Sequence, residues 1–136
     1  HLMRDQAFFM GMPKEVICLA QRFASNYTFF AESHYPWYLK ATFDFTMCEI
    51  LGAKLQSKQA IHFMDLGDER AVAYVPVWQH RHTEWWILVG KLHDRVFRSE
   101  ELKVVAIGMT QFFERMASGQ GRYYFDDSGF VAPASL

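Results

Sequence analysis

The sequence has little cysteine and almost no net charge. Its 136 residues contain two cysteines, and 14 basic residues stand against 15 acidic ones, which gives a formal net charge of −1. Two cysteines are too few for a disulfide framework, and Cys18 and Cys48 both lie in apolar runs that we expect to be helical. Buried thiols of this kind are typical of proteins in a reducing compartment. We therefore expect a cytoplasmic protein.

The balanced charge and the short apolar runs also limit the partners. Binding to nucleic acid or to an anionic membrane surface needs clustered lysine and arginine, for which this balance gives no sign. Arg22, Glu32, Lys40 and Asp44 interrupt the apolar stretches before any of them reaches the roughly 18 residues that span a bilayer. We expect no nucleic acid partner and no direct insertion into a membrane.

Catalytic motifs are missing as well. The sequence contains no nucleophile elbow, no glycine-rich phosphate loop and no His-Glu-x-x-His pattern. His93 and Asp94 are adjacent in a polar loop, where neighbours rarely face each other, so we interpret them as a solvated pair rather than as an oriented base. We predict that the protein is not an enzyme, with a small α+β enzyme of dispersed site as an alternative. Whether a cofactor is bound is unknown from the sequence.

The chain is rich in apolar residues, at 51%, and in aromatic residues, at 17%. A chain of this length and composition forms one globular domain with a large core or a sticky face. We expect residues 1–12 to be a tag remnant or a loose N-terminus. Residues 13–118 are predicted to form the single domain, and residues 119–136 a C-terminal tail or linker.

The spacing of apolar residues predicts an α+β fold. Steps of three and four residues favour helices and alternation favours strands. The predicted helices cover 13–32, 37–55 and 99–119, and the predicted strands cover 61–65, 71–79 and 85–92. The third strand is apolar on both faces and is therefore placed centrally in the sheet. The class that follows is a small antiparallel β-sheet flanked by helices.

Pro76 and Ser99 add detail to the predicted second strand and third helix. Pro76 cannot donate a hydrogen bond to a sheet, which predicts that its strand is an edge or carries a bulge. Ser99, followed by two glutamates, is a good cap for the third helix.

Alternation along the first two strands divides their side chains between two faces. We interpret the first face as plain core; it carries Ile61, Phe63, Ala73, Val75 and Val77. The second face mixes aromatic and polar side chains, as in a cavity or groove; it carries His62, Met64, Tyr74, Trp78 and His80. From it we draw a candidate ligand site of His62, Tyr74, Trp78 and His80, together with Trp85. The alternative is a half-buried sheet that binds nothing.

Two turn histidines are weak candidates for a metal site. His80 and His82 stand two residues apart, with Glu84 nearby as an oxygen ligand. A structural site needs about four ligands, so we favour solvent-exposed histidines and predict no metal.

The order of several segments resembles a GAF domain. The segments that resemble the family are Arg70–Trp78 with its Val-Pro run, the apolar Trp86–Leu92, and Phe97–Leu102 followed by an amphipathic helix. In addition, Ile50–Ala53 is similar to the end of the first helix of the family. The resemblance covers about residues 38–117. It implies a GAF-like (profilin-like) sandwich and a sensory or regulatory domain of a signalling protein. Such a domain binds a small molecule or a partner and passes its state through terminal helices to a fused or interacting output domain.

One departure from the family bears on the cavity. Family members place short helices and a long loop before the Val-Pro strand, and these roof the ligand cavity, whereas here Leu66–Arg70 alone separate the strands. Either the chain is a reduced member with a shallow or absent cavity, or the alignment of the strands in the first half is wrong.

A second hypothesis needs no ligand. The aromatic residues near the N-terminus, which include Phe29, Phe30, Tyr35, Trp37 and Tyr38, would suit a homodimer interface. The protein would then be a dimerisation or scaffold domain.

Overall fold

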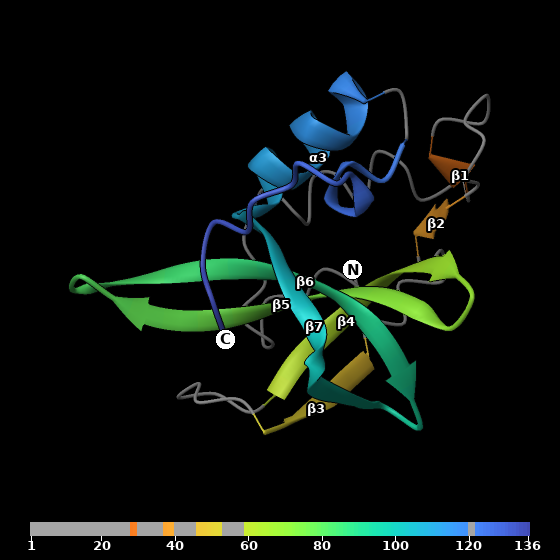
Figure 1. Ribbon diagram of the computed structural model, residues 1–136. Coiled ribbons are helices and arrows are strands. Elements are labelled where there is room, and N and C mark those ends of the chain that lie inside the picture. Colours follow the sequence, from red (N-terminus) through yellow and green to blue (C-terminus); the bar gives the residue numbers. More distant parts are fainter. Residues whose placement is uncertain (1–27, 30–36, 40–45, 53–58, 120–121) are drawn as a thin grey trace, which may run out of the picture.

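The computed structural model describes residues 28–29, 37–39, 46–52, 59–119 and 122–136 (Figure 1). The elements in chain order are β1 (Thr28–Phe29), β2 (Trp37–Leu39), β3 (Thr46–Leu51), β4 (Gln59–Gly67), β5 (Arg70–Gln79), β6 (His82–His93), β7 (Val96–Ile107), α3 (Met109–Ser118) and the 3-10 turn η1 (Tyr124–Asp126).

Five strands close on themselves. Each strand from β4 to β7 pairs antiparallel with the strand before it, beginning with the pair of β3 and β4. In such a series the first and fifth strands point the same way, so the pairing that closes the sheet, between β3 and β7, is parallel. We call β3 to β7 the closed sheet. β2 pairs with β4 and β1 pairs with β2.

The predicted class, a small α+β fold built on an antiparallel sheet, is confirmed at this level. The predicted strands 61–65, 71–79 and 85–92 lie within β4, β5 and β6. β6 lies between β5 and β7, as expected for a strand that is apolar on both faces. Among the described residues, no helix combines the length and hydropathy of a membrane span.

Three two-residue turns connect β4 to β7. Asp68 and Glu69, His80 and Arg81, and Asp94 and Arg95 all have positive φ, between 51° and 67°. Positive φ at both central residues is the geometry of the type I′ hairpin turn, whose twist matches that of the flanking strands. None of the six is a glycine, so the sequence gives only a weak signal for these turns.

The closed sheet has an apolar cluster inside it, which we call the inner cluster. Its buried members are Cys48, Ile50, Ala60, Ala71, Ala73, Val75, Trp86, Leu88, Phe97 and Val104. Three alanines stand beside two large aromatic rings, because the inside of a small closed sheet has room for few large side chains.

A second cluster, which we call the outer cluster, lies between the sheet and the elements that cover it. The sheet side includes Phe63, Tyr74 and Val105, and the cover includes Phe112 of α3 and Phe125. Figure 1 shows α3 and the chain after it over the same side of the sheet. Both faces of this part of the sheet are therefore buried.

β7 bends sharply next to Gly90. Gly90 pairs with Leu102 and Leu92 pairs with Phe97, so that Lys91 alone stands opposite residues 98–101. A Cβ added to Gly90 would lie 2.6 Å from the carbonyl oxygen of Glu101. Real Cβ contacts are not that short, so glycine permits the close approach of the two backbones at this bend.

The helix predicted over 37–55 is wrong wherever the structure describes it. Residues 37–39 form β2 and residues 46–51 form β3, with Ile50 and Leu51 in the strand rather than at a helix end. In β3, Cys48 and Ile50 are buried while Met47 and Leu51 are exposed, which is the alternation of a strand. Cys48 is buried as predicted, but it lies in a strand.

The helix predicted over 13–32 is wrong at residues 28–29, which form β1, and its other residues lie outside the described ranges. The helix predicted over 99–119 is wrong in its first half. Residues 96–107 form β7, and Gly108, with φ of 93°, joins it to α3 at 109–118. The apolar stripe of α3 is as predicted, since Met109, Phe112 and Met116 are buried.

The prediction for Pro76 holds for its end of the strand and not for the strand as a whole, because β5 pairs with β4 as well as with β6. Pro76 pairs with Trp85 of β6. On the other side of β5 the last pair is Tyr74 with Ile61 of β4. Within the described part of the chain, Pro76 therefore lies on an edge, where its missing N–H group costs no sheet hydrogen bond.

Candidate functional site

The two faces predicted for β4 and β5 were matched wrongly across the strands. Directly paired residues share a face of a sheet, and the pairs are Ile61 with Tyr74 and His62 with Ala73. His62 therefore lies on the opposite face from Tyr74. A register shift between His62 and Met64 changes the alternation further along β4. Counting residues along the sequence therefore does not show which residues of β4 share a face with those of β5.

His62 is a buried polar residue, with 4% of its surface exposed. Its Nε2 lies 2.8 Å from Oδ1 of Asp65 and 3.2 Å from the carbonyl oxygen of Met64. The imidazole is therefore held by groups of its own strand.

Tyr74 and Trp85 meet in the outer cluster, with ring centroids 5.4 Å apart. Tyr74 has no exposed surface, and burial raises the pKa of its hydroxyl well above the usual value. This hydroxyl has no hydrogen-bond partner among the described residues. Of the five predicted ligand residues, Tyr74 and Trp85 are in ring contact with each other.

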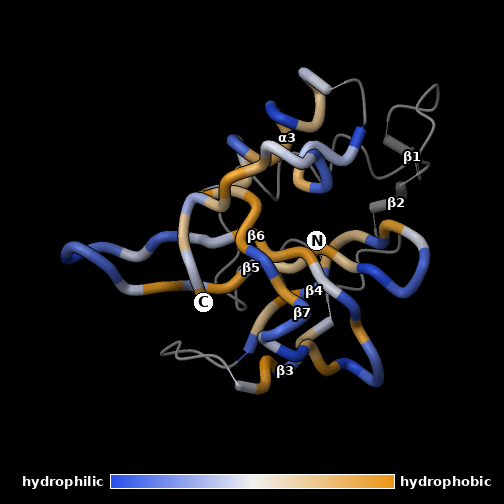
Figure 2. The backbone as a smooth tube through the Cα atoms, in the orientation of Figure 1, coloured by the Kyte–Doolittle hydropathy of each residue, from blue (hydrophilic) through white to orange (hydrophobic). Residues whose placement is uncertain are grey.

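Trp78 and His80 lie on the hairpin of β5 and β6 beyond the closed sheet. We call residues 76–84 the hairpin arm; neither strand has a second described partner there. Figure 1 shows the arm extending away from the body, and Figure 2 shows its tip as hydrophilic. Trp78 is 56% exposed, and His80 occupies the turn.

The histidines of the arm contact groups close to them in the chain. His82 Nδ1 lies 3.2 Å from the carbonyl oxygen of His80, and its Nε2 lies 3.8 Å from Glu84. Within the described ranges, no three histidine, cysteine, aspartate or glutamate residues are placed to hold a metal ion. His93, the last residue of β6, lies 3.5 Å from Glu69 in the turn between β4 and β5, and Asp94 is in the turn that follows His93.

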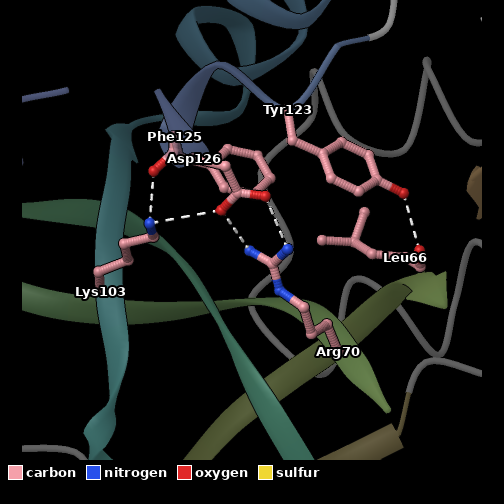
Figure 3. A network of polar contacts seen from close by, with 6 residues as sticks. All are labelled: Leu66, Arg70, Lys103, Tyr123, Phe125 and Asp126. Carbon is pink, nitrogen blue, oxygen red and sulfur yellow. Dashed lines mark hydrogen bonds and ion pairs between the residues drawn. The ribbon is translucent and has the colours of Figure 1, made fainter. Parts of the chain in front are cut away.

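The most developed polar network of the described chain was not predicted from the sequence. It joins the start of β5, the middle of β7 and residues 122–136, which we call the C-terminal segment (Figure 3). Both Nη atoms of Arg70 donate to the two carboxylate oxygens of Asp126, each at 2.8 Å. Lys103 Nζ lies 3.5 Å from the same carboxylate and donates a hydrogen bond to the carbonyl oxygen of Phe125. Two cations of the sheet thus converge on one carboxylate.

Aromatic rings flank this network. The rings of Tyr123 and Phe125 are stacked, with centroids 5.5 Å apart, and the guanidinium of Arg70 lies 5.7 Å and 5.5 Å from them. The hydroxyl of Tyr123 donates to the carbonyl oxygen of Leu66 at 2.7 Å, as Figure 3 shows. These contacts hold Arg70 between its carboxylate partner and two ring faces.

A second set of contacts links the C-terminal segment to β7 and α3. The Tyr124 hydroxyl donates to the carbonyl oxygen of Val105 at 2.6 Å, and the Arg115 guanidinium lies 4.1 Å from the centre of the Tyr124 ring. Burial raises the pKa of Tyr124, so this hydroxyl keeps its proton and remains a donor.

The ion pair is partly open to solvent. The side chain of Arg70 is 25% exposed and that of Asp126 is 42% exposed. The hydrogen bonds from Arg70 lower the pKa of Asp126, and the positive charges of Arg70 and Lys103 add to this effect. A bidentate pair at this exposure contributes about 1 kcal/mol or less, so it can form and break under ordinary conditions.

An open groove lies beside the pair. Its volume is about 390 Å³, and its walls are Arg70, Val89, Gly90, Lys91, Glu100, Glu101, Leu102 and Lys103. The groove is next to the bend of β7, where residues 98–101 bulge away from Lys91. It therefore places three cations and two carboxylates around one opening.

One signal in the sequence pointed to part of this site. Tyr123, Tyr124 and Phe125 form an aromatic run in a stretch predicted as a tail or linker, and such a run is typical of a packed segment. In the structure Tyr123 and Phe125 are buried in the outer cluster. Their partners Arg70 and Lys103 carry no signal that the sequence could reveal.

The structure defines a class: a small α+β domain with a closed sheet of five strands and a C-terminal segment fastened to its outer face. Comparisons with known protein families, curated proteins and solved structures find no match for this chain.

Proposed function

We propose that this domain is a non-catalytic regulatory module of a signalling protein. It binds a small molecule or a partner and transmits the bound state through α3 and the C-terminal segment. The observation that carries the proposal is the bidentate bond between Arg70 and Asp126, which ties the sheet to the C-terminal segment across 56 positions of the chain.

The mode of attachment suits a segment that changes state. A ligand shifts an equilibrium only by binding one arrangement better than the other, and the two arrangements must be close in free energy. Exposed ion pairs and hydroxyl bonds contribute about 1 kcal/mol each, so a ligand of modest affinity can offset one of them. Burial of Phe125 and Tyr123 favours the attached state in its absence.

α3 is coupled to the same face. Phe112 of α3 packs on Phe63 of β4, with ring centroids 6.2 Å apart, and Arg115 lies over Tyr124. A change in the C-terminal segment therefore reaches the helix through direct contacts. The resemblance to GAF domains implies the same kind of transmission through a terminal helix.

Hydrogen exchange tests the proposal. The amides of residues 109–136 are followed by mass spectrometry while a panel of nucleotides, carboxylates and phosphorylated metabolites is added to the intact chain. We expect a ligand that binds to change exchange in this region more than inside the closed sheet. A ligand that binds and leaves residues 109–136 unchanged would contradict transmission.

A ligand-free dimerisation or scaffold domain is the second candidate. The observation that favours it is Trp78, which is 56% exposed on the hairpin arm. Native mass spectrometry of the chain and of Trp78→Ser tests it, with Trp85→Phe as a control inside the folded body. A dimer that Trp78→Ser alone dissociates would support this candidate, and a monomer at high concentration would contradict it.

A further inference from the structure

The polar network resembles an occupied anion site more than an ordinary surface ion pair. The two Nη atoms of Arg70 donate to the two oxygens of the Asp126 carboxylate, and Lys103 Nζ lies 3.5 Å from Oδ1 of the same carboxylate. This is the arrangement with which proteins recognise carboxylate and phosphate ligands.

We infer that Arg70 and Lys103 form a binding site for a small oxyanion, and that Asp126 occupies this site as an internal ligand. An external oxyanion takes the place of the Asp126 carboxylate and thereby loosens the C-terminal segment. This inference rests on the proposed function, since it names the class of ligand that the module senses.

The two cations belong to the closed sheet, whereas their anion does not. Arg70 opens β5 and pairs with Lys91, and Lys103 pairs with Val89. Both cations therefore start from backbone fixed by sheet pairing, and the C-terminal segment can leave without unmaking those pairs. A site built on strands stays in place when its internal ligand departs.

The groove gives an external ligand a way in. Arg70 and Lys103 are on its wall, and Lys91 adds a third positive charge. Glu100 and Glu101 also line it and are exposed, so the surplus of charge is a single positive unit when Asp126 is displaced. This favours a ligand with one or two negative charges over a polyanion.

Competition from the Asp126 carboxylate limits the apparent affinity of the site for an external oxyanion. A tethered group has an effective concentration in the millimolar range, so an external oxyanion competes poorly with Asp126 until it reaches similar concentrations. Removing the negative charge of Asp126 removes the competitor and exposes the site.

Asp126→Asn is the informative variant, because it keeps the shape of the side chain and removes its charge. Asp127→Asn is the matched control: Asp127 is the next residue and lies 3.7 Å from Arg122, outside the site. Arg70→Gln removes the site, and Arg98→Gln, an exposed arginine of β7, controls for the loss of one positive charge.

The experiment is a heteronuclear NMR titration at constant ionic strength, in separate arms with inorganic phosphate and with succinate. We expect saturable shifts at the amides of Gly90, Lys91 and Lys103. Binding should be about fivefold or more tighter in Asp126→Asn than in the unmodified chain and in Asp127→Asn. It should be lost in Arg70→Gln and kept in Arg98→Gln. The arm that binds more tightly identifies the ligand as phosphate or carboxylate.

Two outcomes overturn the inference: equal binding in Asp126→Asn and Asp127→Asn, or unchanged binding in Arg70→Gln. The same spectra separate it from the proposed function. If oxyanion binds Asp126→Asn as expected but leaves the amides of 122–136 unchanged in the unmodified chain, the site stands and transmission fails. If no oxyanion binds while another ligand alters those amides, the oxyanion site fails and transmission stands.

Discussion

The inside of the closed sheet and its outer cover are held together in different ways. The inner cluster is apolar and is built by strands that follow one another along the chain, and two-residue turns join β4 to β7. The cover is a helix and a C-terminal segment whose polar bonds reach residues 56 and 57 positions away. The first region gives a fixed framework, while the second combines burial in the outer cluster with polar bonds that can break one at a time. The regulatory module that we propose needs both.

The largest expected effect comes from emptying the inner cluster. Phe97 has no exposed surface and lies where β7 pairs with both β3 and β6. Phe97→Ala should lower the free energy of unfolding by about 3–5 kcal/mol, because it removes buried apolar surface and leaves a cavity. Denaturant unfolding measures the loss. A change below about 1 kcal/mol would show that the inside of the sheet is not the framework.

Overpacking at the bend of β7 should cost less. Gly90→Ala places a Cβ 2.6 Å from the carbonyl oxygen of Glu101 and from Cδ2 of Leu102. Since the first of these is backbone, we expect a loss of about 1–3 kcal/mol in the same measurement. Gly129→Ala is the control, because a Cβ there meets nothing within 4 Å. Equal effects of the two variants would contradict the close approach at Gly90.

The framework could be predicted from the sequence much better than its cover. Alternation in 61–65 and 71–79 and the continuous apolar run of 85–92 identified three strands, and each of these strands pairs with a neighbour in the chain. The boundary of β7 and α3 could not be found in this way. Val104 packs inside the sheet and Val105 outside it, so both faces of this strand are apolar and its sequence shows no alternation of apolar and polar residues. Ser99 and the two glutamates after it also match the pattern of a helix cap, although they lie in a strand.

The candidate site was still harder to predict. Tyr74 and Trp85 do meet, but His62 is on the other face because β4 carries a register shift. Arg70 and Asp126 are ordinary charged residues 56 positions apart, and only the fold brings them together. Pairings of this kind depend on the register of the strands and on the path of the C-terminal segment. Neither can be deduced from composition or from the periodicity of the sequence.

Two tyrosines test whether the polar contacts of the cover contribute to its attachment. Tyr123 donates to the carbonyl oxygen of Leu66, whereas the hydroxyl of Tyr74 has no partner among the described residues. Tyr123→Phe should therefore cost about 1 kcal/mol and increase the exchange of amides 122–136. Tyr74→Phe should be neutral or stabilising, because it removes a buried hydroxyl that makes no bond. The reverse order of the two variants would contradict the assigned contacts.

The smallest expected effect is the dependence of the attachment on pH. The pKa of Asp126 is lower in the folded protein than its usual value of 3.8, because Arg70 donates two hydrogen bonds to the charged carboxylate. A group whose pKa falls on folding adds stability above the unfolded pKa, and this contribution is lost as the pH falls through the folded pKa. Because the Asp126 side chain is 42% exposed, solvent screening limits the contribution to about 1 kcal/mol or less.

Exchange of amides 122–136 should therefore rise, relative to that of the closed sheet, as the pH is lowered from about 5 towards 3. Asp126→Asn should show the faster relative exchange already at pH 7 and little further change on acidification, while Asp127→Asn should behave as the unmodified chain does. If acidification loosens the C-terminal segment to the same extent in Asp126→Asn as in the unmodified chain, the pH-sensitive contact lies elsewhere and the Arg70 fork is a static attachment.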